Sequence, residues 1–126
     1  MQSPSPTAQT GEYDAQAIAR EIVDVCVDRK ALDVTLIEIG RVTTLAEYFV
    51  ICTGTSDRQI GAIARAVRDA MKEQGIRLLA EEGLPQDGWV LLDYGQVIVH
   101  VFSPEQRAYY DLERRWHEAP TLLRIQ

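Results

Sequence analysis

The chain has 126 residues, of which 46% are hydrophobic and 25% are charged, and this length and balance predict one globular domain with a single core. Its formal net charge of −6 disfavours binding to bare DNA or RNA, because such binding needs lysines and arginines to displace counterions. The same charge favours a basic partner. No apolar run is long enough to cross a membrane.

The N-terminal segment differs in composition from the rest of the chain. Residues 1–16 contain Pro, Ser, Thr, Gln and Gly, but no Lys or Arg and no apolar core. The segment therefore lacks the features of a secretory signal and of an Arg-rich organelle transit peptide. We expect residues 1–16 to be a disordered leader on a cytosolic protein.

Hydrophobic periodicity and turn residues predict alternating helices and strands after the leader. Three helices are expected, over residues 14–29, 57–74 and 104–116. The second begins at a capping box of Ser56 and Gln59 and ends at Gly75, and the third begins at a Ser103 cap followed by Pro104. Five strands are expected, over residues 34–39, 48–52, 76–80, 89–93 and 97–102.

The order of these elements predicts an α/β fold with a mixed five-stranded sheet flanked by three helices. The strands at 48–52 and 76–80, joined by a helix, predict a βαβ unit with parallel strands. The strands at 89–93 and 97–102 predict an antiparallel hairpin around Tyr94-Gly95 or Gly95-Gln96. Residues 117–126 are expected to form a tail, partly ordered through Leu122 and Leu123.

The hairpin determines which side chains share a face. Either two-residue turn pairs odd positions of the first strand with even positions of the second. One face is aliphatic and is expected in the core: Val90, Leu92, Val97, Val99 and Val101. The other face mixes aromatic and polar groups, which is typical of an interaction surface: Trp89, Leu91, Asp93, Ile98, His100 and Phe102. Alternatively, Trp89 and Phe102 pack beneath a helix as ordinary core residues.

The turn at residues 54–57 joins an apolar strand to a helix start and is compatible with two functions. Backbone N–H groups at a helix start can hold an anion, and nucleotidyltransferases bind a triphosphate on such a turn. Those enzymes also need two carboxylates at one-residue spacing on a strand to bind magnesium, and no predicted strand carries such a pair. Capping by Ser56 and the first-turn charge of Asp57 explain both residues without catalysis. A nucleotide-binding or nucleotidyltransferase-like enzyme that uses this turn is the alternative function.

The remaining polar residues predict no enzyme, metal site or cofactor site. His100 lies in the middle of a strand and His117 follows the last helix, and no spacing suggests three or four converging metal ligands. Cys26 and Cys52 lie inside apolar patterns, so we expect buried thiols and not a disulfide or a zinc site.

Three arginines lie on the helix predicted over residues 57–74. They are Arg58, Arg65 and Arg68, and Asp57 and Asp69 on the same helix dilute their charge. This pattern favours a solvated face over a binding site.

Three blocks of sequence read EYFVICTGTSDRQ at positions 47–59, WVLLDYGQVIVHVF at positions 89–102 and RAYYDLERRW at positions 107–116. In order and spacing they resemble the ribosomal silencing factor family, also called RsfS or Iojap. The resemblance covers residues 17–116, which form the expected domain, and leaves the leader and the 117–126 tail outside it. It implies a fold related to nucleotidyltransferases without their catalytic carboxylates.

The resemblance implies a binding factor and not an enzyme. Members of that family bind the fourteenth protein of the large ribosomal subunit, uL14, on the face that meets the small subunit. Bound there, they block subunit association and repress translation when nutrients are scarce. A homodimer in the free state and a bacterial cytoplasmic location are also expected. Neither the resemblance nor the composition implies a cofactor, a membrane or direct DNA binding.

Carried over residue by residue, the resemblance implies a partner-binding surface of seven residues: Trp89, Val90, Leu92, Asp93 and Tyr94, with Asp57 and Arg58 as contributors. Strand alternation conflicts with part of this set, because Val90 and Leu92 should face away from Trp89 and Asp93. If one face of the sheet docks, Leu91 and His100 join Trp89 and Asp93. If the strand edge docks, residues that point to either face of the sheet contribute. Trp89, Asp93 and Tyr94 are the leading candidates.

Overall fold

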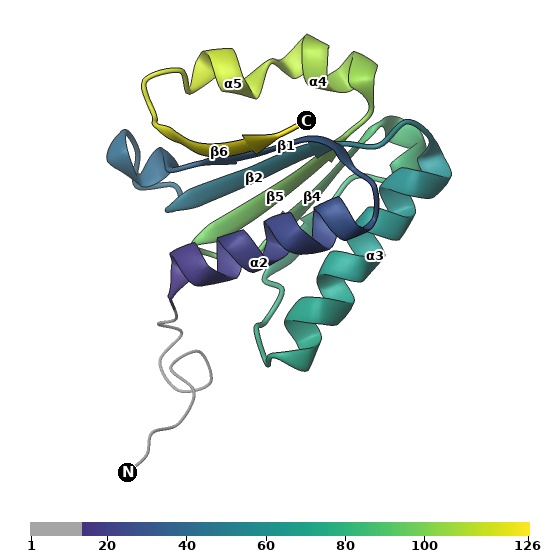
Figure 1. Cartoon of the computed structure of the whole chain (residues 1–126), viewed down its shortest axis with the longest axis horizontal. Helices are drawn as coiled ribbons and strands as arrows, with labels where there is room; N and C mark the ends of the chain where they lie inside the picture. The colour runs from purple at the N-terminus through teal and green to yellow at the C-terminus, as the bar shows by residue number, and fades with distance from the viewer. Residues whose placement is uncertain (1–13) are drawn as a thin grey trace.

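Six strands form one mixed sheet in the computed structural model of the chain, which describes residues 14–126 (Figure 1). Across the sheet their order is β3-β4-β5-β2-β1-β6; β2 and β5 are parallel, and every other neighbouring pair is antiparallel. The predicted α/β class and mixed sheet are confirmed, with six strands where the sequence predicts five. In chain order the strands are β1 (Leu32–Ile37), β2 (Tyr48–Thr53), β3 (Ala80–Glu82), β4 (Trp89–Asp93), β5 (Val97–Phe102) and β6 (Thr121–Ile125).

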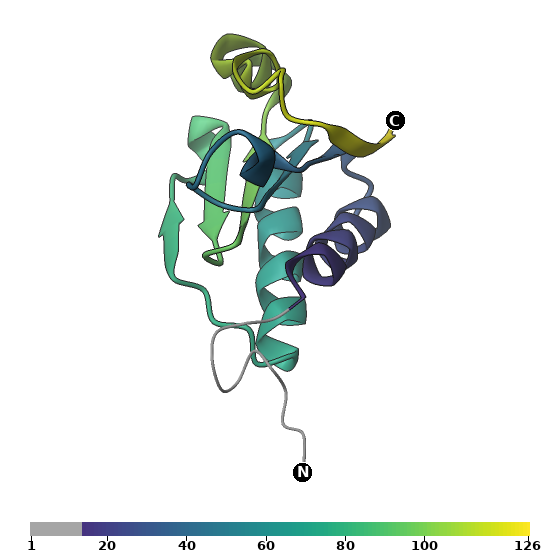
Figure 2. The same cartoon turned by 90° about the vertical axis from the view of Figure 1, so that its left-hand side faces the viewer.

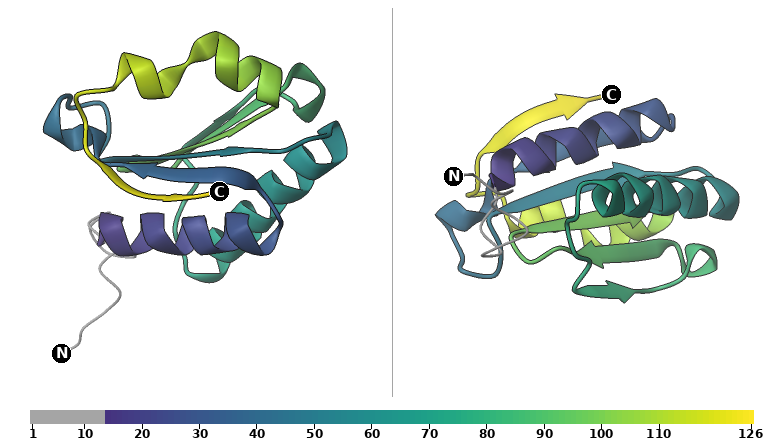
Figure 3. Two further views of the ribbon diagram at one scale, coloured as in Figure 1. Left: turned by 45° about the horizontal axis from the view of Figure 1, so that its top comes forward. Right: turned by 90° about the horizontal axis from the view of Figure 1, so that it is seen from below.

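Helices cover both faces of this sheet (Figures 1 and 3). Helices α2 (Ala15–Asp28) and α3 (Asp57–Glu73) lie side by side on one face, and α4 (Pro104–Tyr110) and α5 (Leu112–Arg115) lie on the other. Short 3-10 turns, Ile39–Arg41 and Pro85–Asp87, lie in the connections. Within residues 14–126, no helix has the length and apolar character needed to cross a membrane.

The first two helices match their predicted ranges to within one residue at each end. Helix α2 begins after Asp14, whose Oδ1 accepts a hydrogen bond from the Ala17 amide over 3.1 Å. Its buried stripe faces the sheet, as helical periodicity predicts. Of the expected leader, residues 1–13 lie outside the described part of the chain.

The predicted βαβ crossover is wrong in its second strand. Residues 76–79 form no strand, and β3 lies further on, at the edge of the sheet, where it pairs antiparallel with β4 (Figure 2). The parallel partner of β2 is β5, which the chain reaches through α3, β3 and β4. Burial explains this order: every residue of β5 is buried, as a central parallel strand requires, whereas all three residues of β3 are exposed.

The predicted helix over residues 104–116 is broken at Asp111. Asp111 has a φ of 49°, a left-handed conformation that ends α4 and precedes α5. The chain then returns along the sheet as β6, antiparallel to β1, with Leu123 opposite Leu36. Residues 117–126, which the sequence leaves outside the domain, therefore contain the sixth strand.

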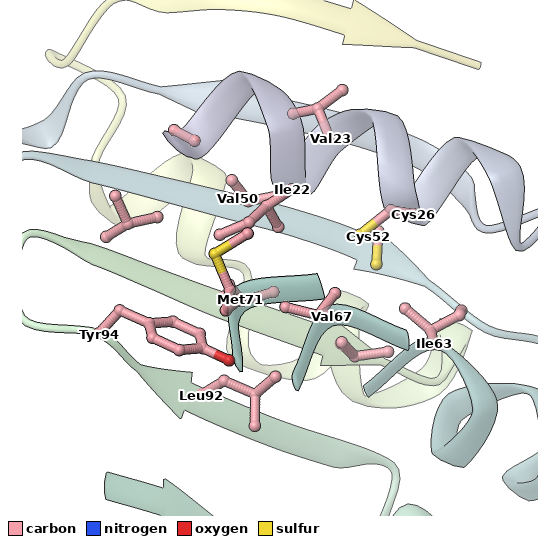
Figure 4. Packing of buried hydrophobic residues seen from close by; sticks show 14 of the residues in the cluster. Ile22, Val23, Cys26, Val50, Cys52, Ile63, Val67, Met71, Leu92 and Tyr94 are labelled. Atoms are coloured by element: carbon pink, nitrogen blue, oxygen red, sulfur yellow. The ribbon is translucent and has the colours of Figure 1, made fainter. Parts of the chain in front are cut away.

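Two apolar cores lie on the two faces of the sheet. The larger, which includes Met71, packs beneath α2 and α3 (Figure 4), and the smaller, which includes Phe102, packs beneath α4 and α5. Cys26 and Cys52 are free, buried thiols in the larger core, as predicted. A hydrogen bond with Cys26 and burial raise the pKa of the Cys52 thiol, so it stays protonated.

Candidate partner-binding surface

The β4–β5 hairpin pairs in the predicted register. Its turn is Gly95-Gln96, because the Tyr94 amide donates to the Val97 carbonyl over 2.9 Å and Gly95 has a φ of 91° that favours glycine. The aliphatic face therefore points toward α3, and the mixed face points toward α4. The opposed pairs on the mixed face are Trp89–Phe102, Leu91–His100 and Asp93–Ile98.

Three of the expected docking residues, Val90, Leu92 and Tyr94, have buried side chains. Each is at most 3% exposed and packs in the larger core (Figure 4 shows Leu92 and Tyr94). Burial raises the pKa of the Tyr94 hydroxyl to about 12. These side chains stabilise the fold and offer no surface to a partner. The sequence leaves two ways of docking open, through one face of the sheet or through the strand edge, and this burial favours the sheet face.

Trp89 belongs to an aromatic cluster on the opposite face. Its ring stacks on Phe102 with 4.9 Å between centroids and lies 4.3 Å from the ring of Tyr110 on α4. Phe102 is fully buried, whereas Trp89 is only partly buried. The sequence leaves open whether Trp89 and Phe102 pack in the core or belong to an interaction surface. Phe102 is a core residue, whereas Trp89 keeps accessible surface.

His100 is a structural residue of this cluster. The indole Nε1 of Trp89 donates to Nδ1 of His100 over 3.2 Å, so Nδ1 is unprotonated and Nε2 carries the ring proton. Burial lowers the pKa of His100 to about 3, which keeps the ring neutral at physiological pH. His100 is therefore a buried, hydrogen-bonded structural residue, and it does not join Trp89 and Asp93 on the accessible surface.

Two carboxylates lie on the same face as Trp89. Asp93 is partly buried, and its Oδ1 accepts from the Gly95 amide over 2.7 Å, so it also stabilises the hairpin turn. Glu82 on β3 lies opposite Leu91 and therefore shares this face. Glu82, Trp89 and Leu91 line part of a hollow of about 170 Å³.

Two tyrosines of α4 extend this surface, and the sequence did not assign them to it. Tyr109 is 78% exposed and Tyr110 is 44% exposed, and their rings meet edge to face at 5.0 Å. Both lie in the third sequence block, but their proximity to Trp89 arises only because α4 folds over the hairpin. We call the combined surface the tryptophan face, defined by Glu82, Trp89, Leu91, Asp93, Tyr109 and Tyr110.

Asp57 and Arg58 lie elsewhere. Both are exposed in the first turn of α3, which covers the sheet face opposite to α4 (Figure 3). The structure therefore does not bring them into the tryptophan face with Trp89.

The capping box at the start of α3 also joins two helices. The Ser56 Oγ accepts from the Gln59 amide over 3.1 Å, as predicted. In a full capping box the Gln59 side chain would accept from the amide of Ser56; here it accepts from the Thr55 amide over 2.7 Å and donates to the Lys30 carbonyl over 2.9 Å. The amides of Thr55 and Gln59 are thus bonded to protein side chains, and Gln59 ties α3 to the end of α2.

Gly54 is required for packing. A Cβ at this position would lie 2.8 Å from Cγ1 of Ile60, so the side chain of Ile60 explains the glycine without a bound anion. Across residues 14–126, no group of three or more His, Cys, Asp or Glu side chains is placed to hold a metal ion.

The chain matches the family model described as "Ribosomal silencing factor during starvation" over residues 12–126. The chain belongs to the ribosomal silencing factor family.

Individual relatives agree with this assignment. Ribosomal silencing factor RsfS of Bacillus subtilis (strain 168) is 40% identical over 105 residues, which cover 83% of this chain and 89% of that protein. "Mitochondrial assembly of ribosomal large subunit protein 1" of Mus musculus is 30% identical over 98 residues, which cover 75% of this chain and 43% of that protein. A crystal structure of a Chromobacterium violaceum protein matches with a TM-score of 0.79 at 35% identity, covering 82% of this chain and 87% of that one.

The three sequence blocks that carry the family resemblance meet at one end of the sheet. Arg107 of the third block is buried, and its Nη1 donates to Oγ1 of Thr53 in the first block over 2.9 Å and to the Asp33 carbonyl over 2.7 Å. Trp89 of the second block contacts Tyr110 of the third. Arg107 thus fixes α4 on the sheet, and α4 carries Tyr110 to the tryptophan face.

Proposed function

We propose that this chain binds the large ribosomal subunit through uL14, blocks association with the small subunit and represses translation under nutrient limitation. Membership of the ribosomal silencing factor family is the observation that carries the proposal. The name of the mouse relative, which refers to the large ribosomal subunit, supports the choice of subunit.

The tryptophan face is the proposed docking surface. Tryptophan and tyrosine are the residues most enriched at the centres of protein interfaces, and Trp89, Tyr109 and Tyr110 lie together here. Glu82 and Asp93 give this face a negative rim, and the chain as a whole carries a net charge of −6. A basic ribosomal protein such as uL14 would be attracted by the negative rim and by the net negative charge of the chain.

The proposed action is steric and needs no chemical step. A 14.2 kDa protein bound on the joining face of the large subunit occupies space that the small subunit needs. The protein would work in the bacterial cytoplasm, where ribosomal subunits associate. We propose no cofactor and no substrate.

Sedimentation with purified ribosomal subunits tests this function. We expect the protein to pellet with large subunits, not with small subunits, and to lower the fraction of joined ribosomes when both are mixed. Tyr109→Ala should reduce pelleting, because Tyr109 is exposed on the tryptophan face. Leu45→Ala is the matched control, since Leu45 is 58% exposed and outside that face. Equal binding to both subunits would refute the proposal.

A further inference from the structure

Helix α3 carries a basic groove on its exposed side. The groove has a volume of about 560 Å³, and its charged lining consists of Arg29, Arg58, Arg65, Arg68 and Asp69. Arg29 follows the end of α2, which Gln59 ties to the start of α3. The whole chain has 19 acidic against 13 basic residues, so a lining of four arginines and one aspartate is a strong local reversal of charge.

Three of these arginines have no ionic partner within the described residues. Arg68 donates to Glu81 over 2.9 Å, but no carboxylate of residues 14–126 lies within ion-pair distance of Arg29, Arg58 or Arg65. The dilution by acidic residues expected from the sequence is therefore incomplete. Three guanidinium groups remain available to an external anion.

The groove extends along α3 toward the other end of the helix. A second hollow of about 330 Å³ has three basic lining residues, Arg68, Lys72 and Arg77, beside Gly75, Ile76, Leu78 and Tyr94, and Arg68 borders both hollows. The helix rises about 21 Å between Arg58 and Lys72. A nucleic acid strand carries several phosphates over such a length.

We propose that this groove binds the sugar-phosphate backbone of RNA. Guanidinium groups match phosphate oxygens in pairs of hydrogen bonds. The uncharged lining of the main groove is small, Gly61, Ala62 and Ala66, so phosphates can approach the helix closely. The choice of RNA rests on the proposed ribosomal function, because the ribosome surface offers RNA beside protein.

The lining of the main groove distinguishes RNA backbone from other ligands. It contains no aromatic side chain on which a base could stack, which favours contact with phosphates and little sequence preference. It also contains no large apolar side chain, so an acidic protein would find charge there but no hydrophobic anchor. The groove lies on the face opposite to the tryptophan face, so both surfaces can be occupied together.

Fluorescence anisotropy with a labelled 20-nucleotide oligouridine and a labelled 20-base-pair RNA duplex tests the inference, from 50 to 300 mM KCl. We expect the wild-type chain to bind both probes, with an affinity that falls as salt rises. The double variant Arg58→Gln with Arg65→Gln should bind the single strand with a shallower salt dependence. The steepness of log K against log salt should fall by roughly 1.4, since each lost phosphate contact reduces that steepness by about 0.7.

The control removes the same charge from other surfaces. Arg41→Gln with Arg114→Gln changes exposed arginines of the first 3-10 turn and of α5 and should leave both affinities within about twofold of wild type. Equal losses in the two double variants, no binding at 50 mM KCl, or equally tight binding of a labelled polyglutamate would overturn the inference. Thermal melts should show that both double variants are folded.

Sedimentation with large subunits separates this inference from the proposed function. If the wild-type chain pellets with large subunits but binds neither RNA probe, only the RNA groove is refuted. If RNA binding follows the predicted salt dependence but no chain pellets with large subunits, the RNA groove stands and the proposed function fails.

Discussion

Trp89 and His100 are joined by a hydrogen bond from the indole Nε1 to the imidazole Nδ1, over 3.2 Å. The bond links a partly exposed residue of the proposed docking surface to a buried, neutral histidine. Because Trp89 is a donor only, the bond requires His100 to stay unprotonated at Nδ1. The shape of the tryptophan face therefore depends on the protonation state of the core beneath it.

Stability should fall as pH falls, because of His100. Its pKa is lowered from 6.5 to about 3 by burial, so below pH 6.5 the unfolded chain binds a proton that the folded chain does not. The contribution of neutral His100 is fully present above pH 6.5 and is lost progressively as pH falls toward 3. We expect a loss of about 1.4 kcal/mol between pH 7.5 and 5.5 from this residue. Urea unfolding at both pH values measures it.

His100→Gln is the control for that experiment. Glutamine does not titrate, and its side-chain oxygen can still accept a hydrogen bond. Other groups titrate equally in both proteins, so the difference between them isolates His100. An identical pH dependence in the two proteins would show that His100 is not the source.

Asp93 should contribute to ribosome binding through its charge. Asp93→Asn keeps the oxygen that accepts from the Gly95 amide and removes only the charge. Because hydrogen bonds to charged groups contribute about 1.5–3 kcal/mol, we expect affinity for large subunits to fall by roughly tenfold or more, while the weaker neutral bond to the Gly95 amide lowers stability by about 1 kcal/mol. Binding curves and thermal melts measure the two effects.

Asp93→Lys should reduce both binding and stability, since it also removes the turn acceptor. If Asp93→Asn binds large subunits as tightly as wild type, the carboxylate acts only in the turn.

Ser56→Ala should lower stability and leave ribosome binding intact. The substitution removes the oxygen that accepts from the Gln59 amide, and loss of an N-cap typically costs about 1 kcal/mol. Chemical denaturation and sedimentation measure the two properties. Unchanged stability together with lost binding would place Ser56 on the docking surface instead.

Arg107 should be the most sensitive charged residue. Its guanidinium is buried and bonded to Thr53, Thr35, Glu113 and the Asp33 carbonyl. Arg107→Ala leaves the buried hydroxyls of Thr53 and Thr35 without their donor, and each buried group left unsatisfied costs about 1–3 kcal/mol, so we expect a loss of more than about 2 kcal/mol in the free energy of unfolding.

Arg124→Ala is the comparison for Arg107. Arg124 binds both oxygens of Asp33, over 2.6 and 2.9 Å, but its side chain is 52% exposed. An exposed pair contributes about 0–1 kcal/mol, so this variant should unfold at nearly the wild-type denaturant concentration. Equal destabilisation by the two substitutions would contradict the role assigned to Arg107.

We expect the free protein to form a homodimer, as the family resemblance implies. On the mixed face of the hairpin Ile98 and Phe102 are buried, so they leave no apolar surface there for a second copy. Tyr109 and Tyr110 add exposed aromatic surface beside Trp89, and a two-fold contact through this face would bury it. Light scattering over a dilution series measures the mass. A monomer at high micromolar concentration would exclude the dimer.

The sequence by itself determined the local structure of this protein. Caps at Ser56 and Ser103 mark two helix starts because each of these side chains accepts a hydrogen bond from an amide of the first turn. The hairpin register followed from the two-residue turn, since side chains alternate along a strand. These features depend on neighbours within a few positions, which the sequence contains.

Only the tertiary structure decided which distant segments meet. The pairing of β2 with β5, the break at Asp111 and the return of β6 depend on competition for buried positions, and local propensity does not record that competition. The tryptophan face and the basic groove on α3 also depend on contacts between segments that are distant in the sequence. Tyr110 reaches Trp89 because Arg107 fixes α4 on the sheet, and Arg29 joins Arg58 because Gln59 ties two helices together.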